Sequence, residues 1–254
     1  MKKYFPTLLV LAGLTPFFLS CNSPADDNQS SPDENDNAKE SVMVPGLIEK
    51  VLSASEQQAL TPDSVLQSLK AGNIRFAKNS LTARNHSAMV RNAANGQYPK
   101  AVILSCLDSR IPVEDIFDKG IGDLFVARQA GNFVNEDILG SMEFGCKVSG
   151  AKLIVVLGHE SCGAIKAAID NVKMGNITAM LAKIAPAVKQ SADFAGNRSA
   201  KDDAYVEYVA KKNVENTVAT ILAKSPILKD MVDKHEIKIV GAYYKIGTGE
   251  VIFL

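Results

Sequence analysis

The chain has 254 residues with 28 basic and 28 acidic side chains, so its formal net charge is zero. Hydrophobic residues make up 46% of it and charged residues 22%, which is ordinary for a globular protein with a substantial core. The balanced charge gives no electrostatic case for a nucleic-acid partner, and the body of the chain lacks the roughly 18-residue apolar run that a membrane span needs.

Residues 1–20 have the layout of a secretory signal peptide. Lys2 and Lys3 precede the apolar run YFPTLLVLAGLTPFFLSC, which ends at Cys21. This arrangement resembles a bacterial lipoprotein signal, in which the cysteine is lipidated and becomes the mature N-terminus. Ordinary cleavage nearby, which would leave Cys21 free, is the alternative. We therefore expect an exported bacterial lipoprotein, periplasmic or on the cell surface, that meets a membrane only through its N-terminal lipid.

The next segment, NSPADDNQSSPDENDNAKES, is acidic and almost free of apolar side chains. Such a segment cannot bury enough surface to offset the entropy of ordering it. We assign residues 21–60 to the lipidated cysteine, an acidic disordered tether and a short lead-in. Residues 61–254 are assigned to a single folded domain.

Helices and strands alternate along that domain. Thr61 is a predicted N-cap with Pro62 at the first helical position. Further helices are predicted over 85–94, at PVEDIF, and over 135–148, 164–172, 176–189 and 202–224. Strands are predicted at KAVILS, DLFVAR, KLIVVLG and IKIVGAYY, and KIGTGEVIFL predicts a turn and a hairpin strand. The alternation indicates an α/β fold with a mainly parallel central sheet flanked by helices.

Reactive side chains stand where the predicted strands end. Cys106 ends the first strand, His159 ends the third, and Cys162 follows where the next helix begins. Ligand sites of open parallel sheets lie beyond the carboxyl ends of the strands, so these residues should converge. Two thiolates and an imidazole favour zinc, and three protein ligands leave the open fourth position of a catalytic site. Cys146 is interpreted as a small buried hydrophobe.

Asp108 and Arg110 follow Cys106 in the stretch CLDSR, and two roles remain open for Asp108. It could be a fourth metal ligand that closes the site, or it could pair with Arg110 and leave that position to water. For this stretch alone, a buried cysteine followed by a surface ion pair is an equally good explanation. A redox protein using Cys106 and Cys162 is a further alternative, although no C-x-x-C motif supports it.

The motifs CLDSR, GHESCGA, GNIRF, GQYPKAVILSC, LFVARQAGN, SMEFGC and VGAYYKIGTGEVIFL resemble those of the β-class carbonic anhydrases, and they span Thr61 to Leu254. The resemblance implies one Zn²⁺ per subunit on Cys106, His159 and Cys162. It also implies reversible hydration of carbon dioxide to bicarbonate and a proton. In this reaction a zinc-bound hydroxide, oriented by an Asp108–Arg110 dyad, attacks the substrate.

The resemblance further implies a set of substrate-binding residues. Gln97 matches a glutamine that donates a hydrogen bond to the substrate, often across a subunit boundary, and Phe125 matches an apolar residue of the CO₂ pocket. Phe144 would wall the same pocket where many members carry tyrosine, and Gly163 matches a glycine whose backbone lies against the substrate. Members form dimers or larger assemblies with N-terminal helices packed on the partner, so we expect a homodimer or homotetramer.

Two alternative functions remain open. Relatives on the same scaffold hydrolyse carbon disulfide or carbonyl sulfide with the same ligands and dyad. A non-catalytic zinc- or bicarbonate-binding lipoprotein is the other alternative. The intact Asp108–Arg110 pair argues against pure binding, because a binding protein has no use for an activated water.

Overall fold

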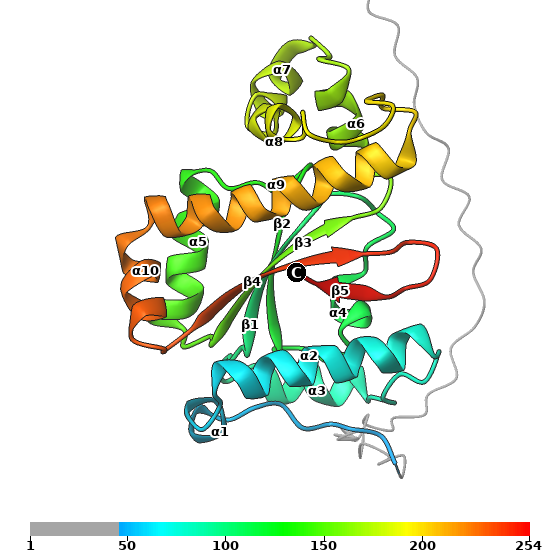
Figure 1. Cartoon of the computed structure of the whole chain (residues 1–254). Coiled ribbons are helices and arrows are strands. Elements are labelled where there is room, and N and C mark those ends of the chain that lie inside the picture. The colour runs from blue at the N-terminus through cyan, green and yellow to red at the C-terminus, as the bar shows by residue number, and fades with distance from the viewer. Residues whose placement is uncertain (1–45) are drawn as a thin grey trace, which may run out of the picture. The chain divides into compact units, whose positions relative to one another are not determined.

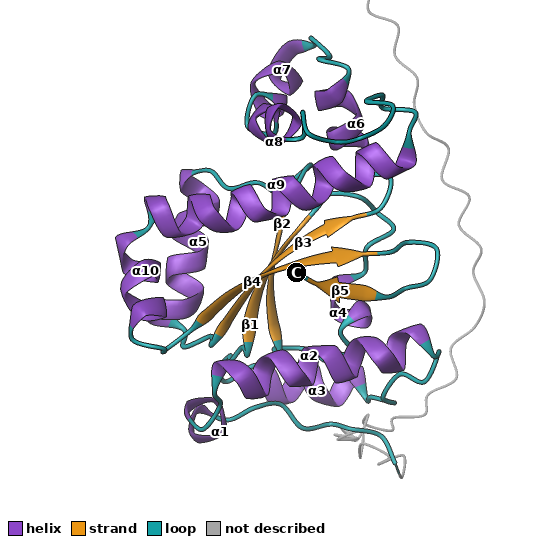
Figure 2. Ribbon diagram, viewed as in Figure 1, coloured by secondary structure: helices purple, strands orange, loops and turns teal. Residues whose placement is uncertain are grey.

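The computed structural model describes residues 46–254. The expected signal peptide, Cys21 and the acidic tether lie outside the described residues. Within them, a five-stranded sheet in the order β2-β1-β3-β4-β5 forms the centre of the fold. Helices cover both faces of this sheet, as Figures 1 and 2 show. No helix in this part of the chain is long and apolar enough to cross a membrane.

The first four strands run parallel and the last is antiparallel. Strands β1 and β3 are buried at every position, which explains their uninterrupted apolar sequences. The predicted α/β fold with a mainly parallel sheet and a C-terminal hairpin strand is therefore confirmed. The strands are β1 (Ala101–Ser105), β2 (Leu124–Arg128), β3 (Leu153–His159), β4 (Lys238–Tyr244) and β5 (Val251–Phe253).

Alternate residues of the strands build a separate core on each face of the sheet. On one face, Ile103 and Val155 pack with Val65 and Leu69 of α2 (Pro62–Ala77). On the other face, Leu104 and Val156 belong to a cluster with α5 (Glu136–Glu143), α9 (Asp203–Lys224) and α10 (Pro226–Asp233). The remaining helices are α1 (Ala54–Gln58), α3 (His86–Ala93), α4 (Val113–Ile116), α6 (Gly163–Ile169), α7 (Gly175–Leu181) and α8 (Ala185–Gln190).

The predicted cap of α2 is present: the Thr61 side chain accepts from the Ser64 amide, and Pro62 begins the helix. The packed part of the chain nevertheless extends further back than Thr61. Ile48 forms a parallel bridge with Arg84, and helix α1 follows it. Buried Gln57 donates hydrogen bonds of 2.7 Å to the carbonyl oxygens of Pro99 and Ser149. The expected start at Thr61 therefore lies inside the packed region.

Three helical segments differ from the prediction. The single helix expected over 135–148 is α5 followed by a π-helical turn, Phe144–Val148. The helix expected over 176–189 is divided into α7 and α8, because the chain turns between Leu181 and Ala185. Helix α10 was not predicted; a single residue, Ser225, separates it from the end of α9 and caps its first turn. None of these differences moves the strand ends that carry the reactive side chains.

Candidate metal centre

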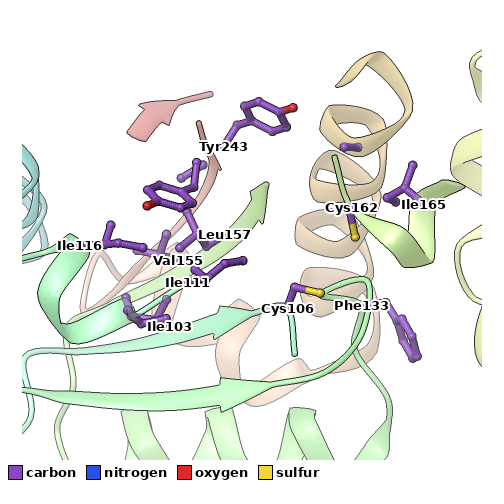
Figure 3. Packing of buried hydrophobic residues seen from close by; sticks show 14 of the residues in the cluster. Ile103, Cys106, Ile111, Ile116, Phe133, Val155, Leu157, Cys162, Ile165 and Tyr243 are labelled. Atoms are coloured by element: carbon purple, nitrogen blue, oxygen red, sulfur yellow. The ribbon is translucent and has the colours of Figure 1, made fainter. Parts of the chain in front are cut away.

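Cys106, His159 and Cys162 come together at the carboxyl edge of the sheet. Cys106 directly follows β1, His159 ends β3, and Cys162 is the residue before α6. One ligand atom from each residue lies within 4.8 Å of the others, and all three residues are buried. Figure 3 shows the sulfur atoms of Cys106 and Cys162 pointing into the same space. The convergence predicted from the strand ends is therefore present, and these residues could hold a metal ion.

The imidazole of His159 presents a lone pair to this space. Its Nδ1 atom lies 2.9 Å from the carbonyl oxygen of Glu160. A carbonyl only accepts, so Nδ1 carries the proton and Nε2 carries the lone pair. Nε2 is buried and has no hydrogen-bond partner among residues 46–254. A metal ion would satisfy this atom, and a backbone-oriented imidazole is typical of metal sites.

The thiols of Cys106 and Cys162 lie close enough to influence each other. Cys106 and Cys162 are free cysteines, not a disulfide. Interaction with Cys162 lowers the pKa of Cys106, while the same contact and burial raise the pKa of Cys162. One thiolate is thus already favoured without a cation, and a divalent cation would favour the second. Two thiolates and a neutral imidazole form a donor set that suits zinc.

The last residue of β2 and the loop after it hold Cys106 from the side. Arg128 Nε donates to the carbonyl oxygen of Cys106 at 3.0 Å, and its Nη2 donates to that of Asp108. The Gly131 amide donates to Cys106 Sγ at 3.4 Å. Buried Asn213, on α9, donates to the Gly131 carbonyl oxygen at 2.8 Å. Arg128 is the last residue of the predicted strand DLFVAR, whereas Gly131 and Asn213 were not predicted, because no local pattern signals a contact across 82 positions.

Asp108 is paired with Arg110 and is not among the three gathered ligand residues. Arg110 Nε donates to Oδ1 at 2.9 Å and Nη2 donates to Oδ2 at 2.7 Å, a bidentate geometry. These bonds lower the pKa of Asp108 to about 2, although burial opposes the shift. Of the two roles left open for Asp108, the structure favours pairing with Arg110.

Gly163, the first residue of α6, directly follows Cys162. A Cβ atom added at Gly163 would meet no heavy atom within 4 Å among the described residues. Space therefore remains open beside the ligand cluster, at the position where the resemblance implies substrate.

The other predicted substrate residues lie elsewhere in the single chain. Phe125 and Phe144 line an apolar groove of about 790 Å³ that crosses β2 and α5. Phe125 is aligned with Val102, four residues before Cys106, which is roughly 13 Å along a strand. Gln97 is exposed and precedes β1, so it lies toward the opposite end of that strand. One chain does not bring these three residues to the metal centre.

Comparison with known proteins places the site in context. The family model described as carbonic anhydrase matches residues 101–251, a range that includes the three ligand positions, Asp108 and Arg110. Carbonic anhydrase 2 of Mycobacterium tuberculosis is 34% identical over 197 residues, which cover 75% of this chain and 92% of that protein. The carbonic anhydrase of Mycolicibacterium smegmatis is 31% identical, with 75% and 92% covered.

Solved structures agree with this comparison. The β-carbonic anhydrase of Coccomyxa, in complex with acetazolamide, superimposes with a TM-score of 0.60 at 26% identity and covers 75% of this chain and 84% of its own. A tetrameric β-carbonic anhydrase of Sordaria macrospora also gives a TM-score of 0.60, at 22% identity, and covers 76% and 95%. The latter shows likeness of fold alone.

Proposed function

This chain belongs to the β-class carbonic anhydrase family, and from that premise we propose that it hydrates carbon dioxide reversibly to bicarbonate and a proton, using one Zn²⁺ held by Cys106, His159 and Cys162. The observation that carries the proposal is the gathering of these three ligand atoms within 4.8 Å. The Nε2 atom of His159, which has no hydrogen-bond partner in the described part of the chain, supports the same assignment. Three protein ligands leave a fourth position for the reacting oxygen, as catalytic zinc requires.

The residues around the ligands have separate roles in the proposed reaction. A zinc ion in this site would acidify a water molecule, so that hydroxide forms near neutral pH. Asp108, kept ionised by Arg110, can only accept a hydrogen bond. It therefore selects an attacking oxygen that still carries a proton, and it turns the lone pair of that oxygen toward the substrate. The space beside Gly163 leaves room for carbon dioxide.

We further propose a homodimer or homotetramer in which subunits complete one another's substrate pockets. The support is that Phe125 and Phe144 line an apolar groove away from the metal centre of their own chain, and that Gln97 is also distant from it. Light scattering should report an assembly of at least two chains. Gln97→Ala should lower CO₂ hydration with an unchanged zinc content.

Three cysteine and aspartate variants test the function. Cys162→Ser should lose zinc and CO₂ hydration together, because a neutral hydroxyl is a poor replacement for a thiolate. Asp108→Asn should keep zinc and lose most turnover. Cys146→Ser is the matched control: this free cysteine lies outside the site, and burial raises its pKa to about 12. It should keep both properties. Stopped-flow hydration and metal analysis measure the two quantities.

A metal-free wild-type protein that still hydrated carbon dioxide would refute the proposal. Competitive turnover of carbon dioxide against carbon disulfide and carbonyl sulfide separates the proposed activity from that of hydrolases on this scaffold. A clear preference for either sulfur compound would replace carbon dioxide as the assigned substrate.

We also propose that the enzyme is exported and anchored through lipid on Cys21. The support is the sequence alone, with Lys2 and Lys3 before an apolar run that ends at the cysteine. Mass spectrometry of the mature N-terminus should find acyl chains on Cys21. Cys21→Ser should move the protein from the detergent phase to the aqueous phase, and an unmodified N-terminus in the wild type would count against anchoring.

A further inference from the structure

A second cavity, of about 350 Å³, lies at the amino ends of β1 and β2. Its wall includes Lys100 and Asp123, which directly precede these two strands. The metal centre is at the other end of β1, roughly 17 Å away along the five residues of the strand. The cavity is therefore separate from the site already described.

Most charges around this cavity are paired. The Asp118 side chain is fully buried and accepts from Arg75, from Arg84 at 2.7 Å and from the Thr82 hydroxyl at 2.6 Å. Asp123 accepts from Lys100 at 2.7 Å and from the Gly120 amide at 2.8 Å.

At the rim of the cavity, Lys50 pairs with Glu56. With Asp118 and Asp123 engaged as well, each carboxylate that lines the cavity already has a cationic partner.

Lys119 is the exception. The residue is only 8% exposed, and it lines the cavity. Its Nζ donates to the carbonyl oxygen of Ser68 at 3.1 Å, and no carboxylate among residues 46–254 forms an ion pair with it. Burial, followed by repulsion from Lys100, lowers the pKa of Lys119 to about 8. Within the described part of the chain, Lys119 is thus a buried cation of the cavity without a carboxylate partner of its own, and an ammonium group has three donors to satisfy.

We propose that this cavity binds a small oxyanion of the size and charge of bicarbonate or phosphate, with Lys119 as its principal contact. An oxyanion supplies a negative charge and accepts hydrogen bonds from the remaining N–H groups of Lys119. The carboxylates of Asp118 and Asp123 do not fill this role, because they are already ion-paired with Arg75, Arg84 and Lys100. The volume is ample for such a ligand and its remaining water molecules.

Binding would also act on the N-terminal side of the domain. The segment over 48–52 forms one wall of the cavity, together with Glu56 of α1. It is fastened to the domain by two backbone hydrogen bonds, from Ile48 to Ala83 and from Asn85 to Ile48. An anion that neutralises the cavity should stabilise this wall, so hydrogen exchange over 48–56 reports on binding independently of catalysis.

The test uses the zinc-loaded full chain and two probes, sodium phosphate and sodium bicarbonate, with sodium chloride at matched ionic strength as the salt control. Either oxyanion should slow exchange over 48–56. Lys119→Met should weaken this effect about tenfold or more, because a charge-assisted hydrogen bond is lost. Lys119→Arg keeps the charge and should retain binding. Lys173→Met removes an exposed lysine outside the cavity and should behave as the wild type.

The two probes distinguish the source of the ligand. Protection by bicarbonate alone identifies the reaction product as the ligand, and protection by phosphate alone identifies free phosphate. Protection by both supports a site that selects by charge. Protection that appears only around Cys106 and His159, or that persists unchanged in Lys119→Met, overturns the proposal.

Discussion

Arg110 fixes Asp108 by two parallel hydrogen bonds, yet its own side chain is half exposed. Replacing it with leucine leaves Asp108 free to rotate and raises its pKa toward the ordinary range. We expect Arg110→Leu to lower kcat for CO₂ hydration about 100-fold, since misplacement of an orienting group has effects of this size. Stopped-flow assays measure the loss.

Arg110→Lys is the control for charge without the planar fork, and it should give an intermediate rate. Zinc content should be unchanged in both variants, because Arg110 does not belong to the ligand cluster. Equal rates for the wild type and Arg110→Leu would show that the pair is only structural.

Asn213 acts on the metal site through Gly131. Its amide fixes the Gly131 carbonyl, and the amide of Gly131 donates to the Cys106 sulfur. We expect Asn213→Leu to weaken zinc binding about tenfold, the lower end of effects seen when residues around metal ligands are changed. Competition with a chromophoric chelator measures the affinity, and the sulfur-to-metal charge-transfer band of the cobalt-substituted enzyme should shift.

Thr217→Val provides the matched control for Asn213. Thr217 lies one turn further along α9, is equally buried, and donates its hydroxyl hydrogen bond to the Asn213 carbonyl. Its loss should cost about 1 kcal/mol of stability without moving the cobalt spectrum. The same spectral shift in both variants would mean that α9 acts only through general stability.

Helix α2 approaches the end of α4 too closely for any side chain at Gly72. A Cβ atom there would lie 1.8 Å from the Phe117 carbonyl oxygen. We expect Gly72→Ala to lower the free energy of unfolding by about 3 kcal/mol or more, because backbone must move to relieve the overlap. Urea denaturation measures the change.

Gly140, in α5, has the open surroundings that Gly72 lacks. An added Cβ there meets no described atom within 4 Å. Gly140→Ala should therefore stabilise the protein by up to about 1 kcal/mol through helix propensity. If Gly72→Ala and Gly140→Ala had the same free energy of unfolding, the inference that α2 and the end of α4 pack too closely for a side chain at Gly72 would be wrong.

Asp118 joins α2, the loop before α3 and the segment after α4. Burial favours its neutral form, but hydrogen bonds from Thr82, Arg84 and Arg75 outweigh burial and lower its pKa. The stabilisation is therefore complete above the unfolded pKa of about 4 and is lost as pH falls below it. Melting temperatures between about pH 6 and 3 should fall less steeply in Asp118→Asn than in the wild type. Parallel curves would show that Asp118 does not carry this acid sensitivity.

Over the whole domain, the metal ligands join three separate segments: the ends of β1 and β3 and the start of α6. An ion bound there holds together parts of the chain that are 56 positions apart, from Cys106 to Cys162. Removing zinc with a strong chelator should lower stability by about 4 kcal/mol when zinc had been present at 1,000 times its Kd. Calorimetry with and without added zinc measures the change, and an unchanged melting temperature would exclude a stabilising metal.

The fold was predictable to the extent that strand ends are visible in the sequence. The apolar runs of β1 and β3 predicted the sheet, and the positions where these runs end predicted Cys106 and His159 as candidate ligands. Helix α1 was missed because its short sequence has too few residues to show a helical period, and its stability comes from Gln57 contacts over 42 and 92 positions.

The candidate site was predictable in its ligands but not in its supports. Cys106, His159 and Cys162 follow from chemistry and position, whereas the hydrogen bond from Asn213 to Gly131 depends on where a distant helix lies. Phe125 and Phe144 were assigned to the pocket by resemblance, and one chain leaves them in a separate groove. A sequence read as a single chain contains no geometric information about what a second copy would contribute.

The Nδ1 proton of His159 is donated to the main-chain carbonyl oxygen of residue 160, a group that every amino acid has. Substitutions at position 160 should therefore leave the tautomer of His159 unchanged. Proline is the exception, because the Glu160 amide donates a hydrogen bond to the Tyr244 carbonyl oxygen. The imidazole orientation therefore does not depend on which side chain stands at position 160, and the carboxylate of Glu160 instead accepts a hydrogen bond from the Gly247 amide in the hairpin turn.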